Sequence, residues 1–418
     1  MSEQLVINGG NPLKGHINIA GAKNSALPLL AATLMTEEPV VLENIPLLDD
    51  VSTMLSMIKG LGKQITQLEP SKVRITGPIK INRAPEELVR KMRASFLVLA
   101  PLLGTVGEAE VPLPGGCNIG TRPVDLHLNG LSELGTEITQ TDGKIIAHAN
   151  ELLGADIFLD YPSVGTTEQL LMGAVKASGK TTIYNGAQEP EVRDLVHFLQ
   201  QLGANIEVNG SVLTVEGTTK LTGGTYKVLP DRIAAGTYMV AVGSTGGNVV
   251  LNDVRPSTLK QLTSKLRNAG IEVNEQKDTI EVISESRPRS LEVITLPYPG
   301  FPTDLQAPIT TFLALANGKS VVKETVFDSR FGHVAELRKM GADISVPNSS
   351  TLFINGKKNL RGTKVSATDI RAGASLVVAG LAATGQTVIS GTEHIDRGYS
   401  NLVDNFQRLN ADLDRLHA

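Results

Sequence analysis

The sequence predicts an α/β protein made of two similar inside-out α/β barrel domains, with helices inside and sheets outside. Three observations predict this fold: a helix-ending motif that recurs six times, a second glycine motif with the same period, and apolar helices without a polar face. At 418 residues the chain is also too long for one ordinary core, which favours two domains.

The first motif is an amphipathic helix that ends at a glycine and leads into a strand, with the pattern Leu-x-x-Leu-Gly-x-x-Ile. Its cap recurs every 67 to 73 residues, at Gly62, Gly135, Gly203, Gly270, Gly341 and Asn410. In the second motif a small-residue helix is followed by a glycine turn and a β-branched strand. Its glycines lie 67 or 72 residues apart, at Gly107, Gly179, Gly246, Gly318 and Gly385. Two independent markers with one period indicate six copies of a βαβαββ-type unit.

Six units are compatible with one ring, a solenoid or two domains of three units each. Solenoid repeats are usually shorter, and helices such as LMGAVKAS and FLALANG are apolar all round, which favours burial inside domains. We expect a first domain over residues 22–229 and a second over residues 1–21 and 230–418. The strand before Gly21 is expected to pair with the second domain, because the last unit reaches the C-terminus without its closing strand.

Composition narrows the classes of partner. The net charge of −4 gives no basic footprint for nucleic acid or for an anionic membrane. The start of the chain does not resemble a signal peptide, and Pro101 interrupts the most apolar run, Phe96 to Leu103. The single cysteine favours a reducing compartment, and the seven histidines are scattered. We therefore expect a cytoplasmic protein with no metal, no membrane partner and no nucleic-acid partner.

A glycine- and proline-rich segment around Cys117 departs most from the repeat pattern. A Gly-Gly-Cys-x-x-Gly loop favours an exposed, reactive thiol, and Arg122 would favour the thiolate. A free cysteine is more often a buried small residue, so this alternative stays open.

Charged residues near apolar helices form a second group of candidates. Lys23 and Asn24 begin an apolar helix, where backbone N–H groups attract anions, although Lys23 could equally be a solvated lysine. Asp304, in a proline-flanked turn, could be a general base or a helix cap. Arginines near element ends could bind phosphate or carboxylate in one cleft, or be ordinary surface residues: Arg93, Arg232, Arg330, Arg371 and Arg397.

These segments together resemble the enolpyruvyl transferase family. The resemblance runs in order through GAKNSALP, MRASFLVLAPLL, PGGCNIGTRPVDLH, SVGTTEQLLM, NGAQEPEV, LPDRIAAGT, YPGFPTDLQ, DSRFGHVAEL, TDIRAGASLVVAG and HIDRGYSNL. It implies the same pair of three-unit domains. It also implies transfer of the enolpyruvyl group of phosphoenolpyruvate to the 3′-hydroxyl of UDP-N-acetylglucosamine with release of phosphate, the first committed step of peptidoglycan synthesis.

The resemblance also implies roles for individual residues. Cys117 would be the general acid and could become covalently attached to phosphoenolpyruvate, Asp304 would be the base, and Asp369 would belong to the proton-transfer network. The residues implied to bind phosphoenolpyruvate are Lys23, Asn24, Arg122 and Arg397, with Lys23 and Arg397 also catalytic. Those implied to bind UDP-N-acetylglucosamine are Asn24, Arg93, Arg122, Pro123, Val124, Asp125, Leu126, Ser163, Val164, Gly165, Asp304 and Val326.

One departure and three alternatives accompany this assignment. Tyr161 stands where some family members carry a lysine, so a nucleotide contact there would be weaker or of another kind. No metal and no bound cofactor are implied. The alternative substrate is shikimate 3-phosphate, although the transferase acting on it lacks the Cys117 loop. An RNA 3′-phosphate cyclase would need a nucleotidyl-accepting histidine and a basic face, neither of which is evident in the sequence. A non-enzymatic repeat scaffold would have an extended shape.

The Cys117 assignment predicts covalent inhibition by fosfomycin, an epoxide that resembles phosphoenolpyruvate. We expect a mass increase of one adduct and loss of activity, both measured on the intact protein. Cys117→Asp should retain some turnover, because a carboxylic acid can still donate a proton, and should escape the inhibitor. Unchanged inhibition of that variant would refute the assignment.

Overall fold

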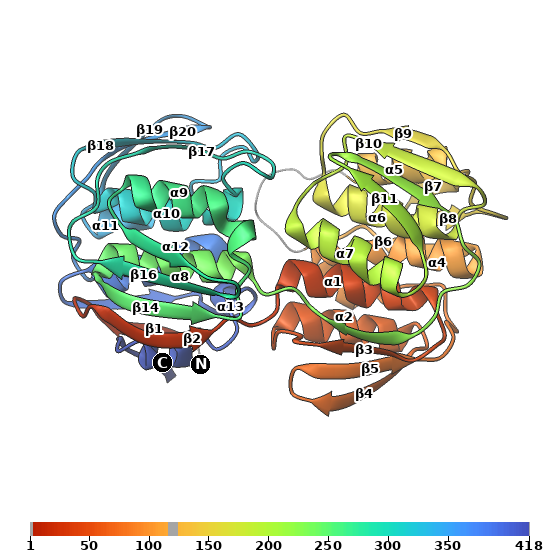
Figure 1. Cartoon of the computed structure of the whole chain (residues 1–418), viewed down its shortest axis with the longest axis horizontal. Coiled ribbons are helices and arrows are strands. Elements are labelled where there is room, and N and C mark those ends of the chain that lie inside the picture. Colours follow the sequence, from red (N-terminus) through yellow and green to blue (C-terminus); the bar gives the residue numbers. More distant parts are fainter. Residues whose placement is uncertain (1–2, 116–123, 418) are drawn as a thin grey trace. The chain divides into compact units, whose positions relative to one another are not determined.

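The computed structural model describes residues 3–115 and 124–417, without the side chain of residue 417. The chain divides into two compact units (Figure 1). We call the described residues of Gly21–Leu229 the N-terminal unit, and those of Met1–Ala20 and Pro230–Ala418 the C-terminal unit. This division differs at residue 21 from the domain boundaries predicted above, which stay a prediction.

The N-terminal unit contains three sheets and a set of helices (Figure 1). Its helices are α1 (Lys23–Ala32), η1 (Thr33–Met35), α2 (Asp49–Gly60), α3 (Glu86–Lys91), η2 (Arg93–Val98), α4 (Leu99–Val106), α5 (Asp125–Glu133), α6 (Val164–Lys176) and α7 (Pro190–Gln201), where η marks a 3-10 helix. Its strands are β3 (Val40–Glu43), β4 (Gln64–Glu69), β5 (Lys72–Thr76), β6 (Glu108–Pro112), β7 (Glu137–Thr141), β8 (Lys144–His148), β9 (Asp156–Phe158), β10 (Lys180–Tyr184), β11 (Asn205–Asn209), β12 (Val212–Glu216) and β13 (Gly224–Lys227).

The C-terminal unit is built in the same way. Its helices are α8 (Arg232–Thr245), η3 (Pro256–Leu259), α9 (Lys260–Asn268), η4 (Thr303–Leu305), α10 (Gln306–Ala314), α11 (Gly332–Lys339), α12 (Ile370–Ala382), α13 (Thr392–Asp396) and α14 (Leu402–Arg408). Its strands are β1 (Glu3–Asn8), β2 (Leu13–Asn18), β14 (Gly247–Asn252), β15 (Glu272–Glu275), β16 (Thr279–Ser284), β17 (Glu292–Ile294), β18 (Lys319–Lys323), β19 (Asp343–Asn348), β20 (Thr351–Asn355), β21 (Lys364–Ser366), β22 (Gln386–Ser390) and β23 (Asp412–His417).

One sheet topology recurs through both units. In β9-β10-β12-β11 the first two strands are parallel, and the other two pair with them as an antiparallel hairpin. The same order appears in β13-β3-β5-β4, β2-β14-β16-β15, β17-β18-β20-β19 and β21-β22-β1-β23. The sixth sheet, β6-β8-β7, has a parallel bridge from Arg83 to Glu110 in place of its outer strand. The βαβαββ prediction is therefore confirmed, with separate sheets rather than one closed barrel in each unit.

Strand β1 completes the sheet of the last repeat, as the sequence predicts. It pairs antiparallel with β22 on one side and with β23 on the other. The first strand of the chain thus supplies the hairpin partner that the last repeat lacks.

The small-residue helices form the interior of the units. In α8, α10 and α12 nearly every residue is buried, and these three helices pack against one another. In the N-terminal unit α1 is equally buried, and α4 packs on α6. No helix in the described residues is long and apolar enough to span a membrane.

The two glycine motifs meet a backbone requirement. The five cap glycines of the first motif have φ between 84° and 115°, and Asn410 has φ of 66°. This left-handed conformation ends a helix at little steric cost only for glycine and, to a smaller degree, asparagine. The repeat period therefore reports the positions at which helices must end.

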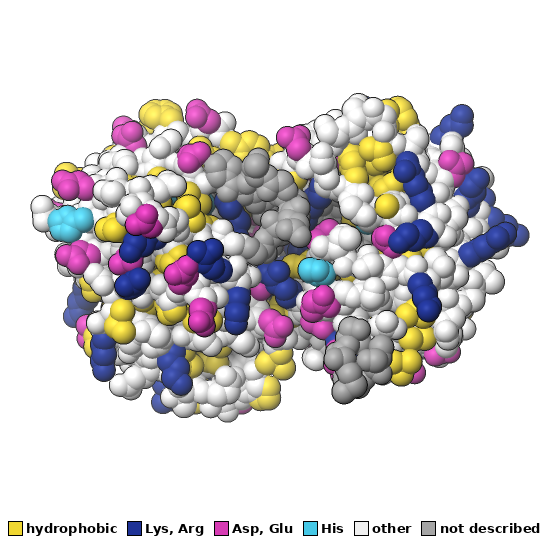
Figure 2. Space-filling model, turned by 180° about the vertical axis from the view of Figure 1, so that it is seen from behind, with side chains coloured by type: hydrophobic (Ala, Val, Ile, Leu, Met, Phe, Trp, Pro, Cys, Tyr) yellow, Lys and Arg dark blue, Asp and Glu magenta, His cyan; other side chains and the backbone are white. Residues whose placement is uncertain are grey.

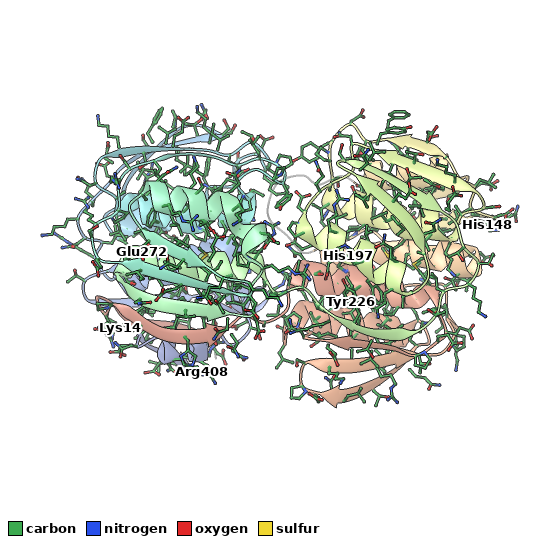
Figure 3. The ribbon with its side chains drawn as sticks, in the orientation of Figure 1. Lys14, His148, His197, Tyr226, Glu272 and Arg408 are labelled. Atoms are coloured by element: carbon green, nitrogen blue, oxygen red, sulfur yellow. The ribbon has the colours of Figure 1, made fainter. Side chains whose placement is uncertain are left out.

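A buried carboxylate ties the last strand of the N-terminal unit to its helices. Asp194 on α7 accepts hydrogen bonds from Tyr226 Oη at 2.8 Å, from Leu229 N at 3.1 Å and from Ser25 Oγ. Tyr226, labelled in Figure 3, lies on β13. Asp194 is only 2% exposed, so water does not substitute for these bonds.

We expect Asp194→Ala to destabilise the N-terminal unit by about 3–5 kcal/mol, because several buried donors lose their acceptor at once. Urea denaturation followed by circular dichroism measures this loss. Glu207→Ala, which removes an exposed carboxylate from β11, is the control and should change stability by less than about 0.5 kcal/mol. Equal losses for the two variants would contradict the assigned role.

Candidate active-site residues

Lys23 is the first residue of α1 and is buried, so it is not a solvated surface lysine. Its Nζ lies 3.0 Å from Oδ2 of Asp50, which is itself buried near the start of α2. The carboxylate offsets a full positive charge that sits at the positive end of a helix dipole. The ammonium is therefore held in place where an anion could bind.

His127 joins three segments that the sequence predicts to bind the sugar nucleotide. Its Nδ1 lies 3.2 Å from Gln169 Oε1, and its ring meets the ring of Phe96 edge-on at 5.4 Å. A Cβ on Gly165 would lie 3.4 Å from its Cε1, so the two residues are in close contact. The imidazole thus links η2, α5 and the start of α6.

Burial, reinforced by the nearby charge of Arg93, lowers the pKa of His127 to about 4. The imidazole is therefore neutral at pH 7, and its role in this arrangement is one of packing and hydrogen bonding.

The other predicted nucleotide residues of the N-terminal unit lie at the starts of helices. Arg93 begins η2, and Ser163 caps α6 by accepting a hydrogen bond from Thr166 N. Val124 is buried, whereas Asp125 is exposed at the first position of α5. Of the remaining predicted positions in this unit, Asn24 is exposed, and Leu126, Val164 and Gly165 are half-buried. Tyr161, which stands where some family members carry a lysine, is exposed.

Glu168 is a further buried acid of the same unit. Glu168 on α6 is buried, and burial, together with the charges of Glu191 and Glu189, raises its pKa well above the usual range. The sequence gives no indication of this, because a single glutamate in an apolar helix carries no partner signal.

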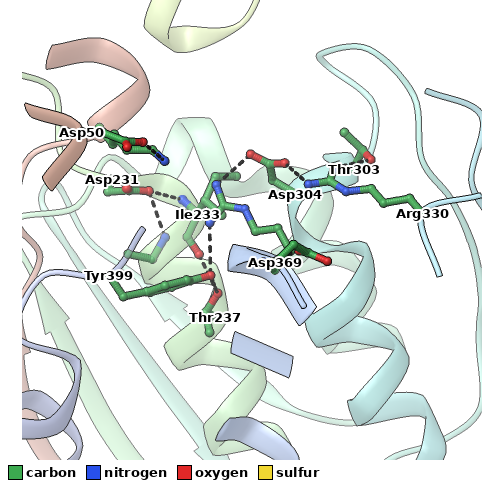
Figure 4. A network of polar contacts seen from close by, with 12 residues as sticks. Asp50, Asp231, Ile233, Thr237, Thr303, Asp304, Arg330, Asp369 and Tyr399 are labelled. Atoms are coloured by element: carbon green, nitrogen blue, oxygen red, sulfur yellow. Dashed lines mark hydrogen bonds and ion pairs between the residues drawn. The ribbon is translucent and has the colours of Figure 1, made fainter. Parts of the chain in front are cut away.

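Asp304 is the centre of the polar network in the C-terminal unit (Figure 4). Its Oδ1 accepts from Arg330 Nη2 at 2.8 Å, and its Oδ2 accepts from Arg371 Nη2 at 2.8 Å. Both arginines are buried. The arginine group singled out in the sequence thus converges in part, with two of its five members on one carboxylate.

The pKa of Asp304 reflects this pairing. Burial alone would raise it, but the charges of Arg371 and Arg330 and their hydrogen bonds outweigh burial and hold the pKa well below the usual range. The carboxylate is therefore ionised at neutral pH. It is also a weak base in this arrangement, because each oxygen already accepts a bond from a guanidinium.

Arg371 is held from its other side as well. Its Nη1 donates to Tyr399 Oη at 3.2 Å, and that hydroxyl lies 2.9 Å from Thr237 Oγ1 on α8 (Figure 4). Asp369 caps α12, with Oδ1 accepting from Arg371 N at 2.8 Å and Ala372 N at 3.0 Å. The capping explanation thus applies to Asp369, whereas Asp304 forms a double ion pair.

The remaining predicted residues lie in other parts of the two units. Arg397 is half-buried directly after α13, and Val326 is half-buried in the turn after β18. Cys117, Arg122 and Pro123 lie outside the described residues. Among the described residues, no group of three or more histidine, cysteine or acidic side chains could hold a metal ion.

Several residues of these networks do not stand out in the sequence. Asp50 has a weak signal, since Asp49 and Asp50 together begin an amphipathic helix, but nothing indicates its pairing with Lys23. His127 and Tyr399 lie next to predicted residues and differ in no visible way from ordinary core positions. These residues are recognised only by their contacts with residues that lie far away in the sequence.

The low pKa of Asp304 predicts a pH-dependent contribution to stability. We expect Asp304→Asn to lower the free energy of unfolding by roughly 1–3 kcal/mol at pH 7, because two buried guanidinium groups lose their counter-charge. The folded-state pKa lies below the ordinary value of 3.8. The contribution is therefore complete above about pH 4 and disappears as the pH falls through the folded-state pKa.

Denaturation of the wild type and Asp304→Asn between pH 7 and pH 2 measures this difference. Asp343→Asn, which breaks an exposed pair with Lys357, serves as the control and should cost less than about 1 kcal/mol. A difference between wild type and Asp304→Asn that stays constant down to pH 2 would rule out the proposed ion pairing.

Comparison with solved structures confirms the α/β fold. The enolpyruvyl transferase NikO from Streptomyces tendae superposes with a TM-score of 0.90 at 24% identity, covering 100% of this chain and 99% of that one. EPSP synthase from Acinetobacter baumannii superposes with a TM-score of 0.77 at 20% identity, covering 100% of both chains.

Sequence comparison gives more similar relatives. A UDP-N-acetylglucosamine 1-carboxyvinyltransferase from Caldanaerobacter subterraneus is 46% identical over 99% of this chain and 100% of its own. One from Carboxydothermus hydrogenoformans is 47% identical over 99% of each chain. The family model described as EPSP synthase (3-phosphoshikimate 1-carboxyvinyltransferase) matches residues 7–406. The chain therefore belongs to the EPSP synthase family of enolpyruvyl transferases.

Proposed function

We propose that this chain transfers the enolpyruvyl group of phosphoenolpyruvate to the 3′-hydroxyl of UDP-N-acetylglucosamine, releasing phosphate, in the first committed step of peptidoglycan synthesis. Full-length relatives near 46% identity that carry the name of this activity support the choice of acceptor. The observation that carries the proposal is the Asp304 carboxylate between buried Arg330 and Arg371, beside an apolar interior.

The reaction needs acid, base and charge stabilisation in turn. In the proposed addition step, the Cys117 thiol gives its proton to C3 of phosphoenolpyruvate, and the 3′-hydroxyl oxygen bonds to C2 while Asp304 takes the hydroxyl proton. In the elimination step the C2–O bond to phosphate breaks and phosphate leaves, while C3 gives a proton back to the Cys117 thiolate so that the C2–C3 double bond re-forms. Asp369 belongs to the proposed proton-transfer network.

The anionic substrate is the proposed partner of the basic residues. Lys23, Arg122 and Arg397, with Asn24, would bind phosphoenolpyruvate, and the burial of Lys23 beside Asp50 supports this, because a fixed ammonium needs little reorganisation to stabilise an anion. A substrate oxygen that draws Arg371 or Arg330 away from Asp304 would also raise the pKa of that carboxylate. Binding of the anion would thus turn a weak base into a stronger one.

Backbone and side-chain groups at helix starts are the proposed sugar-nucleotide contacts. These proposed contacts are Arg93, the run from Arg122 to Leu126, Ser163 to Gly165, Asp304 and Val326. Free N–H groups at helix starts suit a pyrophosphate.

Acidic and basic side chains both lie on the face shown in Figure 2. The expectation of a cytoplasmic protein without a nucleic-acid partner stays a prediction.

The test is phosphate release from phosphoenolpyruvate by the purified full-length chain. We expect release that depends on UDP-N-acetylglucosamine and is unchanged by a metal chelator, with a product mass equal to the sugar nucleotide plus the enolpyruvyl group. Shikimate 3-phosphate serves as the control acceptor and should give at least about 100-fold lower kcat/KM, because a site built for a nucleotide leaves polar groups unpaired with a smaller substrate. Preference for shikimate 3-phosphate would overturn the proposal.

A further inference from the structure

We propose that Glu324 is a positioning residue for the acceptor half of the reaction, holding both the turn that contains Val326 and the Asp304–Arg330 pair. It would act through these groups and would not itself touch a substrate. The inference rests on the proposed function for the identity of the acceptor. The geometry on which it stands lies wholly within the C-terminal unit.

Glu324 follows β18 and is 2% exposed. Its Oε1 accepts hydrogen bonds from Val326 N at 2.9 Å and Phe327 N at 3.1 Å. One carboxylate oxygen therefore closes the turn that carries Val326, a predicted nucleotide contact. Thr295 Oγ1 donates to the same oxygen at 2.8 Å and fixes it from the neighbouring strand segment.

The second oxygen of Glu324 leads to the Asp304 network. Oε2 accepts from Thr303 Oγ1 at 2.8 Å, and that hydroxyl oxygen accepts from Arg330 Nη1 at 2.8 Å. Arg330 donates its other nitrogen to Asp304, as Figure 4 shows. The hydroxyl of Thr303 is thereby oriented: its hydrogen points to Glu324 and its lone pair to Arg330.

A second route joins the same groups. The ring of Phe327, whose N–H is bonded to Glu324, lies 5.3 Å from the guanidinium carbon of Arg330. Such a ring face attracts a cation and restricts where the guanidinium can lie. Glu324 therefore orients Arg330 both through a hydroxyl and through an aromatic ring.

These four donors to the Glu324 carboxylate are all neutral groups, two backbone N–H groups and two hydroxyls. A carboxylate can accept all four bonds, whereas a glutamine amide has one acceptor oxygen and places its NH₂ group against other donors. Glu324→Gln thus changes the hydrogen-bonding pattern while keeping size and shape. Either the turn or the Thr303–Arg330 link has to rearrange.

The experiment compares Glu324→Gln with the wild type in the full-length chain. We expect the KM for UDP-N-acetylglucosamine to rise at least about tenfold and kcat to fall, while the KM for phosphoenolpyruvate changes less than about twofold. Hydrogen–deuterium exchange should be faster in peptides covering residues 325–331. A loss of folded protein alone would lower the apparent kcat and leave both KM values unchanged.

Glu336→Gln is the matched control. Glu336 is also a buried carboxylate of this unit and also accepts from a backbone N–H, that of Ser366 at 3.0 Å. Both of its oxygens also accept from Lys339 Nζ, at 2.7 Å and 2.9 Å, on the surface of α11. We expect its effect on both KM values to stay within about twofold.

Thr295→Val keeps the experiment decisive if Glu324→Gln does not fold. It leaves the carboxylate in place and removes one of its donors, together with the acceptor of Thr325 N in the same turn, so the same change in KM should appear in weaker form, about two- to fivefold. An unchanged KM for the sugar nucleotide in a folded variant, or equal increases for both substrates, would overturn the proposal. Failure of the proposed function would give a different result. The wild-type enzyme would not use UDP-N-acetylglucosamine, while hydrogen–deuterium exchange at residues 325–331 would still be faster in Glu324→Gln.

Discussion

Burial of the central helices determines where this chain can place polar chemistry. Helices α1, α6, α8, α10 and α12 are enclosed along nearly their whole length, so their sides carry no functional group that reaches a solvated ligand. Their N-terminal ends are different, because the first turn has N–H groups without a partner inside the helix and lies at the positive end of the dipole. A fold of this kind concentrates anion-binding capacity at helix starts.

The candidate residues follow this constraint in both units. Each of these five helices has one at or just before its first turn: Lys23 at α1, Ser163 at α6, Arg232 at α8, Asp304 before α10, and Asp369 and Arg371 at α12; in the remaining repeat Arg93 begins η2, which leads into α4. The repeat therefore explains more than the shape of a unit. Six copies of one element supply six helix starts, and the copies differ mainly in the side chain that each start carries.

Positive charge at a positive helix end needs compensation before a ligand arrives, and nearby carboxylates provide it. Asp50 pairs with Lys23, and Asp304 pairs with Arg330 and Arg371. Removal of either carboxylate would leave buried cations unpaired, which is far more costly than loss of a surface pair. The same carboxylates keep the cations at fixed positions, so an anionic substrate would meet charges that are already placed.

These features were not equally visible in the sequence. The helix caps, the buried helices and the closing role of β1 could be predicted because each depends on local backbone rules or on the repeat, as Gly203 and Gly341 show with φ of 105° and 93°. The sequence could identify the arginines as candidates, but it could not show which carboxylate each one pairs with. Glu324 could not be found, because two of its four donors, Thr295 and Thr303, come from segments whose proximity to β18 is fixed only in the folded unit.

The Asp304 network shows that the partners of a side chain, more than its residue type, determine its chemical role. A carboxylate in a turn can be a cap, a base or a counter-ion, and the sequence leaves all three open. Two guanidinium groups make it a counter-ion in this arrangement and lower its pKa, so its basicity is set by what else those arginines bind. A ligand anion that competes for Arg371 would strengthen the base at the moment it is needed. Acid–base strength at this site is thus a property of the arginine pairing, and the residues that hold the arginines, Thr303, Phe327 and Tyr399, contribute to it without being acids or bases in the reaction.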